Sequence, residues 1–595
     1  MMSEEKPKRK RTVILVVSVL VVLIGVIGIT YAYFTAGSLD SDSSITVTTA
    51  KIGLVYESGS TMSGVNIAPG WTESKTFTVK NNSTVVLYYE ILWTDVSNTF
   101  VTKEDLVYSL TCISDVVSNT CSGVSETIFP SSEESILANI EIEPNELHTY
   151  TLTVTYKDQP YNQIDNMGAT YAGRIVVRES EEGSIAFVKN FGGSGAEFFY
   201  SVQETSDGGY VAVGYSDSID GDLTGLNKGG RDCIIVKYNS SGDIDWNKNF
   251  GGTSSDSFGS VQETSDGGYI VVGYSQSTDV DLLGLNKGGQ DAIIVKYDSS
   301  GNVIWNKNFG GSSSDNFEDV KTTGDGGYIV VGYSYSTNGD LTGLNKGSED
   351  AIIVKYDSSG NVVWNKNFGG NYLELFINVV TTLDGGGYVA VGYSSSTDGD
   401  LTGLYKGGSG NDAIIVKYDS SGNVVWNKNF GGTGDDTFSG MALTMDGGYI
   451  AVGSSSSTNG DLTSLNKGSL DAITVKYDSS GNVVWNKNFG GTGAETFYGV
   501  AQTSDGGYMA VGQSTSADGD ITGLNKGSSD AIIVKYDSSG NVVWNKNFGG
   551  SNYDTFRGGA LTSDGGYTTV GYSMSNDGDF TSNKGMSDAF IVKGK

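Results

Sequence analysis

Apolar and polar residues alternate with a period of two in several short segments between residues 42 and 180, which is the pattern of half-buried β-strands. Polar, turn-rich pieces separate these segments. The pattern therefore predicts an antiparallel β-sandwich over residues 42–180. The predicted strands are 44–57, 75–81, 85–96, 106–113, 148–158 and 171–180.

Beyond residue 183 a different pattern recurs seven times at a nearly constant spacing. Each copy carries a DGGY-type turn and a WNKNFGG-type segment, and the spacing changes only around the fourth copy, where extra residues fall in predicted loops. A repeat of this length indicates a propeller or a solenoid. The turn tyrosines are Tyr210, Tyr269, Tyr328, Tyr388, Tyr449, Tyr508 and Tyr567, and the segment aromatics are Phe187, Trp246, Trp305, Trp364, Trp426, Trp485 and Trp544.

One copy, residues 311–370, shows the four strands that each unit is expected to form. The second and third, 328–334 and 350–357, are apolar at almost every position, which is typical of strands covered on both faces. The fourth, 361–370, carries Asn and Lys and is expected at the outer edge. We interpret the tryptophan of this strand as a residue that packs between units.

The two ends of the array predict how it closes. It begins with a fourth-type strand, 186–193, and ends with a third-type strand, 588–595. The sequence therefore predicts a seven-bladed β-propeller over residues 185–595, preceded by a linker at 181–184, in which the N-terminal strand completes the last blade. The repeat resembles bacterial seven-bladed β-propeller repeat proteins, a resemblance that implies an architecture and no activity.

The N-terminus is the one part that departs from the all-β pattern. A basic segment, 1–11, precedes an uncharged apolar run from Val13 to Ile29. We predict a transmembrane helix or a signal peptide over 12–34, with the basic segment in the cytoplasm. The protein is then expected on the extracellular face of the cell membrane as a single-pass protein, or secreted after cleavage of its leader.

Residues 20–180 resemble camelysin/TasA-like exported proteins, whose leaders are processed by a SipW-type signal peptidase. The matching features are TYAYFT at 30–35 and APGWTESKTFTVKNNST at 68–84. The resemblance implies a secreted or surface β-sandwich and implies no enzyme.

Charge and the rare residues limit the chemistry. The chain of 595 residues has a formal net charge of −32, which disfavours nucleic acid as a partner. Cys112 and Cys121 flank a polar loop and are able to form a disulfide if the domain is exported, whereas Cys233 takes a place where the other copies have Ala and is expected to be buried. The single histidine, His148, is expected at a surface or a strand edge, and one histidine leaves a serine triad or a histidine-based metal site incomplete.

Seven acids follow the GlyGly pairs of the repeats, each just before the Phe that opens the first strand of a unit. In a propeller we expect them to ring one mouth of the central channel, either as a cation site, with calcium as the candidate, or as acceptors of hydrogen bonds within the blades. No other cofactor is predicted. The seven are Glu197, Asp256, Asp315, Glu374, Asp436, Glu495 and Asp554.

The long loops between second and third strands carry further acids, such as Asn338 and Asp340, and an LNKG step that includes Lys346. We interpret the acids as structural, because their spacing does not match a twelve-residue calcium loop. The LNKG step lacks the surrounding phosphate-binding loop. The copies are nearly identical, so no blade is expected to carry its own chemistry.

The first functional hypothesis is therefore a non-enzymatic surface protein whose propeller binds an extracellular ligand, glycan or protein, with membrane contact only through an uncleaved N-terminal helix. Two alternatives stay open: an extracellular polysaccharide hydrolase or lyase that uses carboxylate pairs, and a structural component of the cell surface or a biofilm matrix.

Overall fold

The computed structural model divides the chain into two compact units, one up to Ser184 and the other from Ile185 to Gly594. It describes residues 30–31, 54–58, 68–82, 87–116, 121, 123–132, 134–143, 145–161, 163–166, 169–179, 185–408, 410–463, 465–580 and 583–595. The predicted basic segment and linker lie outside these residues. Each unit is all-β, which confirms the predicted fold class.

The predicted membrane anchor is not supported. Among the described residues, no helix is long and apolar enough to cross a bilayer. Most of the expected helix over 12–34 lies outside the described residues, but its end does not: Thr30–Tyr31 form β1, which pairs antiparallel with β9 (Tyr171–Glu179). The single-pass localisation predicted from the apolar run is therefore withdrawn.

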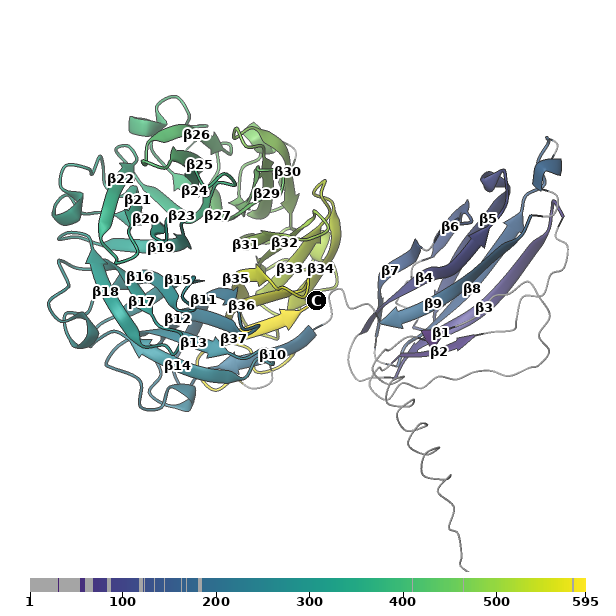
Figure 1. Cartoon of the computed structure of the whole chain (residues 1–595), viewed down its shortest axis with the longest axis horizontal. Helices are drawn as coiled ribbons and strands as arrows, with labels where there is room; N and C mark the ends of the chain where they lie inside the picture. Colours follow the sequence, from purple (N-terminus) through teal and green to yellow (C-terminus); the bar gives the residue numbers. More distant parts are fainter. Residues whose placement is uncertain are drawn as a thin grey trace, which may run out of the picture. The chain divides into compact units, whose positions relative to one another are not determined.

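The first unit is a sandwich of two antiparallel sheets (Figure 1). One sheet has the strand order β1-β9-β4-β7 and the other β2-β3-β8-β5-β6. The strands not yet bounded are β2 (Leu54–Ser58), β3 (Thr72–Asn81), β4 (Leu87–Asn98), β5 (Leu106–Ser114), β6 (Val124–Ile128), β7 (Glu134–Ile142) and β8 (Leu147–Tyr156), and two 3-10 turns are η1 (Lys103–Asp105) and η2 (Ile164–Asn166).

The core lies between the sheets. Along β8 every second side chain is buried, from His148 to Tyr156, as its alternating sequence predicts. These side chains pack with residues of the other sheet such as Trp93 and Ile175. His148 is the exception to our expectation: it is buried, its Nδ1 lies 2.7 Å from Tyr89 Oη, and its Nε2 lies 3.0 Å from Glu146 Oε1. His148 faces inward because it lies on the same face of β8 as the buried apolar residues, which occupy every second position of the strand.

The two sandwich cysteines are joined. Cys112 at the end of β5 and Cys121 form a disulfide with a Cα–Cα distance of 5.7 Å, so the structure decides the question that the sequence left open. Cys233 is free and buried, as expected, and burial raises the pKa of its thiol.

The second unit is a ring of seven four-stranded antiparallel sheets (Figure 1). The first three complete blades are β11 (Glu197–Glu204), β12 (Tyr210–Ser216), β13 (Asp232–Tyr238), β14 (Ile244–Phe250); β15 (Asp256–Glu263), β16 (Tyr269–Ser275), β17 (Asp291–Tyr297), β18 (Val303–Phe309); and β19 (Asp315–Thr322), β20 (Tyr328–Ser334), β21 (Asp350–Tyr356), β22 (Val362–Phe368).

The next three are β23 (Glu374–Thr381), β24 (Gly387–Ser394), β25 (Asp412–Asp419), β26 (Val424–Phe430); β27 (Asp436–Leu443), β28 (Tyr449–Ser455), β29 (Asp471–Tyr477), β30 (Val483–Phe489); and β31 (Glu495–Gln502), β32 (Tyr508–Ser514), β33 (Asp530–Tyr536), β34 (Val542–Phe548). The loops hold short 3-10 turns η3 (Gly221–Leu223), η4 (Val280–Leu282), η5 (Gly339–Leu341), η6 (Gly399–Leu401), η7 (Gly460–Leu462) and η8 (Gly519–Ile521).

The last blade contains strands from both ends of the array, in the order β10-β37-β36-β35. β10 (Ile185–Phe191) pairs antiparallel with β37 (Asp588–Gly594), next to β36 (Tyr567–Ser573) and β35 (Asp554–Leu561). In Figure 1 the blue β10 lies beside the yellow β37. The predicted closure by the N-terminal strand is therefore confirmed.

Neighbouring blades are joined by an aromatic contact that recurs around the ring. The outer-strand Trp246 packs on Tyr269 of the next blade, with ring centroids 5.9 Å apart, and the equivalent pairs repeat to Trp544 and Tyr567. Phe187 on β10 takes the place of Trp against Tyr210 at the closure. The tryptophans are blade-packing residues, as the sequence indicated.

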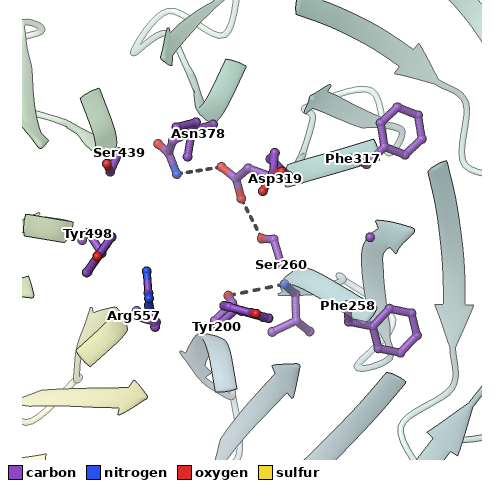
Figure 2. A pocket seen from close by; sticks show the side chains of 18 of the residues that line it. Tyr200, Phe258, Ser260, Phe317, Asp319, Asn378, Ser439, Tyr498 and Arg557 are labelled. Atoms are coloured by element: carbon purple, nitrogen blue, oxygen red, sulfur yellow. Dashed lines mark hydrogen bonds between the residues drawn. The ribbon is translucent and has the colours of Figure 1, made fainter. Parts of the chain in front are cut away.

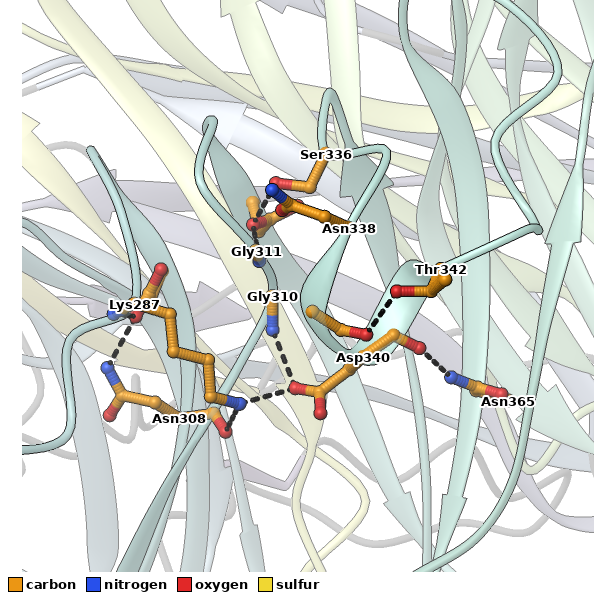
Figure 3. Close-up of polar contacts among 12 residues, drawn as sticks. Lys287, Asn308, Gly310, Gly311, Ser336, Asn338, Asp340, Thr342 and Asn365 are labelled. Atoms are coloured by element: carbon orange, nitrogen blue, oxygen red, sulfur yellow. Dashed lines mark hydrogen bonds and ion pairs between the residues drawn. The ribbon is translucent and has the colours of Figure 1, made fainter.

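The loop acids and the LNKG lysines form a second set of links between blades (Figure 3). Lys287 Nζ lies 2.5 Å from Asp340 Oδ2 of the next blade, and Asp340 also accepts a hydrogen bond from Gly310 N at 3.0 Å. Asn338 accepts from Ser312 N at 2.8 Å. These loops are therefore held by direct bonds, which agrees with their structural interpretation.

Candidate functional site: the central channel

The innermost strand of each blade faces a cavity of about 710 Å³ at the centre of the ring. This is the range in which most small-ligand sites fall, roughly 300–1,000 Å³. Figure 2 shows side chains from different blades that point into this space, while Phe258 and Phe317 point away into the blades. The innermost strands are β11, β15, β19, β23, β27, β31 and β35.

Every innermost strand carries a β-bulge at the same position. In β11, Phe199 pairs with Gly214 and Ser201 with Val213, so Tyr200 has no partner across the sheet. The bulge is supported from both sides: Phe199 is fully buried, and a Cβ on Gly214 would lie 1.8 Å from the carbonyl oxygen of Phe198. Glycine is thus required where the bulged backbone approaches β12. Bulges commonly redirect a side chain beside a functional site.

The seven bulged residues all line the cavity, and six residue types occur among them, with tyrosine at two positions. We expected that no blade would differ from the others in its functional side chains. The structure corrects this expectation, because residues that vary between the blades lie together on the wall of the channel. The signal was present in the sequence as the variable residue directly after an invariant Phe. The bulged residues are Tyr200, Gly259, Glu318, Ile377, Ser439, Tyr498 and Arg557.

One side of the channel is built around a buried carboxylate. Asp319 accepts hydrogen bonds from Ser260 Oγ at 2.6 Å, from Asn378 Nδ2 at 2.9 Å and from Val379 N at 3.0 Å, and it forms an ion pair with Lys321 at 2.8 Å (Figure 2). These partners lie on three adjacent innermost strands. Asp319 therefore ties this wall together, and its acceptor capacity is used within the protein.

Glu318, the bulged residue next to Asp319, is able to accept further hydrogen bonds. It accepts one hydrogen bond from the Asn316 side chain. Burial is the main cause that raises the pKa of Glu318 to about 7; the nearby carboxylates of Asp319 and Glu349 also act upward, and the hydrogen bond from Asn316 acts downward. The wall therefore presents a carboxyl group that changes charge near neutral pH.

The other side of the channel combines glycine with aromatic rings and one arginine. The guanidinium carbon of Arg557 lies 4.2 Å from the ring centroid of Tyr498 and 5.7 Å from that of Tyr572. Burial raises the pKa of Tyr200, which also lines this side, to about 12. In three of the blades the residue after the bulge is a glycine, which leaves that position without a side chain. They are Gly440, Gly499 and Gly558.

The seven predicted acids stand at the starts of these strands, but the cavity lining in the described structure includes none of them. All seven are fully buried. Each accepts a hydrogen bond from the second glycine amide of its GlyGly pair and another from a serine of the second strand; Glu197, for example, accepts from Gly193 N and Ser216 Oγ, both at 2.8 Å. Burial raises the pKa of Asp256, and no bound ion tests the calcium hypothesis, which stays a prediction.

Potential ligands of a soft metal gather at one other place among the described residues. Cys112, Cys121 and His148 bring one ligand atom each within 4.8 Å of one another. The two sulfurs are joined in the disulfide, and both ring nitrogens of His148 have hydrogen-bond or ion-pair partners. In this state the group does not fit a metal site.

Comparisons with known proteins give limited sequence relationships. No protein-family model matches the chain. It is 23% identical over 419 residues to the regulatory protein FlaEY of Caulobacter vibrioides, a match that covers 64% of this chain and 42% of the relative. The chain thus spans less than half the length of that protein. The resemblance to camelysin/TasA-like proteins is not shown by these comparisons.

Several solved structures have a similar repeat fold. A chimera of apocarotenoid oxygenase (ACO) and RPE65 matches with a TM-score of 0.33 and 10% identity, covering 79% of this chain and 96% of the chimera. Cobalt-substituted Synechocystis ACO matches with a TM-score of 0.31 and 11% identity, covering 78% and 95%. A DUF4221 family member from Bacteroides vulgatus matches with a TM-score of 0.26 and 10% identity, covering 70% and 100%.

These matches correct one expectation. We predicted that the protein is not an enzyme, and the matched structures include oxygenases, so that prediction is withdrawn. At these TM-scores and identities the likeness assigns no activity to this chain.

Proposed function

We propose that this protein binds a small polar ligand in the central channel of its propeller. The observation that carries the proposal is the position of the sequence variation: in nearly identical blades, the seven bulged positions hold six different residue types, and all seven line one cavity. A repeat that served only to build the ring has no need of different residues at this wall. Glycans fit this proposal best, since the wall offers serine, asparagine and carboxyl groups beside tyrosine rings.

A thermal-shift screen with sugars and other small polar molecules tests the proposal. A ligand that binds only the folded protein, at 100 times its Kd, adds about 2.7 kcal/mol to the free energy of unfolding. Ser439→Trp fills the channel from a half-buried bulge position, and we expect it to abolish the shift.

The control is Ser480→Trp, on an exposed turn of the same blade. It should keep the shift of the unmodified protein. If both variants respond to a ligand like the unmodified protein, the ligand binds elsewhere and the channel is not the site.

A further inference from the structure

Among the described residues, Arg557 has no ion-pair partner. Its electrostatic neighbours are Tyr498, Tyr572 and Tyr553, and its guanidinium donates a hydrogen bond to Tyr572, but its Nε has no hydrogen-bond partner in the part of the chain that the structure describes. Lys321, the other basic side chain of the channel wall, is by contrast bound to both carboxylate oxygens of Asp319. In a chain with a formal net charge of −32, an arginine left unpaired in a partly buried place is an unusual arrangement.

From this geometry we infer that the channel binds an acidic sugar whose carboxylate pairs with Arg557; the inference rests on the proposed channel function and names its ligand class. Arginine presents a planar fork of N–H groups that matches the two oxygens of a carboxylate. Tyr498 covers a face of the guanidinium at 4.2 Å and leaves its N–H edges to point elsewhere. An incoming carboxylate compensates the charge of the partly buried Arg557.

There is room for such a ligand next to the arginine. The residues that follow the bulge in this half of the ring, Gly499 and Gly558, have no side chain to occupy the space, and Gly559 adds a third glycine to the lining. A cavity of about 710 Å³ exceeds a single sugar ring and accepts a short oligosaccharide.

The opposite wall indicates that the rest of the ligand is not anionic. Glu318 and Asp319 lie on that wall and repel a second negative group. Ser260 and Asn378, which also bond to Asp319, lie at the same side, and Ser439 lies on β27 farther round the ring; these hydroxyl and amide groups suit sugar hydroxyls (Figure 2). The arrangement therefore selects a ligand with a carboxylate at one end and hydroxyls at the other.

Isothermal titration with matched sugars tests this inference. The probes are galacturonate and galactose, which differ in the carboxylate. We expect the intact protein to bind the acidic sugars more tightly than the neutral ones. Arg557→Gln should weaken acidic-sugar binding about 10- to 100-fold, as expected for lost charged hydrogen bonds. Arg557→Lys should give an intermediate loss, because it keeps the charge and loses the fork.

The control is Arg231→Gln. Arg231 also stacks on a tyrosine, with its guanidinium carbon 3.8 Å from the Tyr215 centroid, but it is paired with Asp217 and lies outside the channel lining. It should bind galacturonate like the intact protein, and unchanged melting midpoints would show that the variants fold.

The outcomes separate this inference from the proposed function. Equal binding of neutral and acidic sugars, unaffected by Arg557→Gln but lost in Ser439→Trp, overturns the acidic ligand and leaves the channel site standing. If neither these sugars nor any molecule of the screen binds, both proposals are contradicted.

Discussion

Lys584 Nζ lies 2.6 Å from Asp222 Oδ2, so the loop of the last blade is ion-paired to the loop of the first. The same pair links the other blades in turn, for example Lys346 to Asp400. The ring is thus closed in two ways. β10 completes the last blade, and the Lys584–Asp222 ion pair joins the last blade to the first in the same way that equivalent ion pairs join the other neighbouring blades.

The two members of the closing pair should contribute unequally to stability. Lys584 and Asp222 are partly exposed, so Lys584→Met should lower the free energy of unfolding by about 1 kcal/mol or less. Asp222→Ala should cost about 1–3 kcal/mol more, because Asp222 also accepts the hydrogen bond of the buried Gly192 N–H. Urea unfolding measures both.

Lys346→Met, at an interior junction, is the matched control and should equal Lys584→Met. A much larger cost at Lys584 would mean that closure depends on this ion pair, against the expectation.

Closure by β10 should depend on Phe191. This side chain is fully buried and packs on Phe199 of the first blade, with ring centroids 5.5 Å apart. Phe191→Ala should therefore cost about 3–5 kcal/mol in urea unfolding. Phe187→Ala removes a half-buried ring from the same strand and should cost clearly less. Equal costs for the two variants would show that burial in the last blade does not determine the contribution of β10.

Glu318 should make stability depend on pH. Its folded-state pKa is raised from 4.5 to about 7, so on raising the pH the unfolded chain loses this proton first. The wild-type protein therefore loses stability between these two pH values, by at most about 3 kcal/mol. Glu318→Gln removes this loss.

Urea unfolding of both proteins from pH 4 to pH 8 measures the effect. The difference in favour of Glu318→Gln should be smallest at pH 4 and reach a plateau above pH 7. A difference that does not change with pH contradicts the raised pKa.

The sandwich disulfide should stabilise its unit. Cys112 and Cys121 are nine residues apart, and closing a loop of this size contributes about 2–3 kcal/mol. Replacing both by Ser should lower the unfolding midpoint of the sandwich. Cys233→Ala should change stability little, since the other blades already carry Ala there, such as Ala292. Labelling with a thiol reagent should modify no cysteine in the native protein and one after unfolding without reduction.

Calcium binding by the seven acids stays a prediction, and the melting midpoint of the protein with and without calcium tests it. If they hold calcium, millimolar calcium raises the melting midpoint, and Asp315→Asn reduces the rise. Magnesium at the same concentration is the control for ionic strength. An unchanged midpoint in calcium contradicts the cation hypothesis and leaves the hydrogen bonds from Gly311 and Ser336 as the role of Asp315.

Much of the fold was accessible from sequence because its determinants are local. The order of strand types at the two ends predicted that 186–193 completes the last blade, and β10 pairs with β37 as expected. The apolar second and third strands predicted burial on both faces, which β13 shows at every position. Such features depend on period and count, which a linear sequence contains.

The candidate site was less accessible, because it depends on which way side chains point. Tyr200 and Arg557 follow a buried Phe in a strand of alternating residues, and only the bulge register turns them into the channel. His148 was misjudged for a related reason: its side of β8 became the inside only when the second sheet covered it.

The sequence by itself therefore determined the number of blades, the order of their strands and the way the ring closes, because repetition and hydrophobic period are properties of the chain. The tertiary structure decided that the seven bulged residues converge on one cavity and that Arg557 has no carboxylate partner there among the described residues. Those facts arise from distances between residues far apart in the chain, which no local pattern encodes.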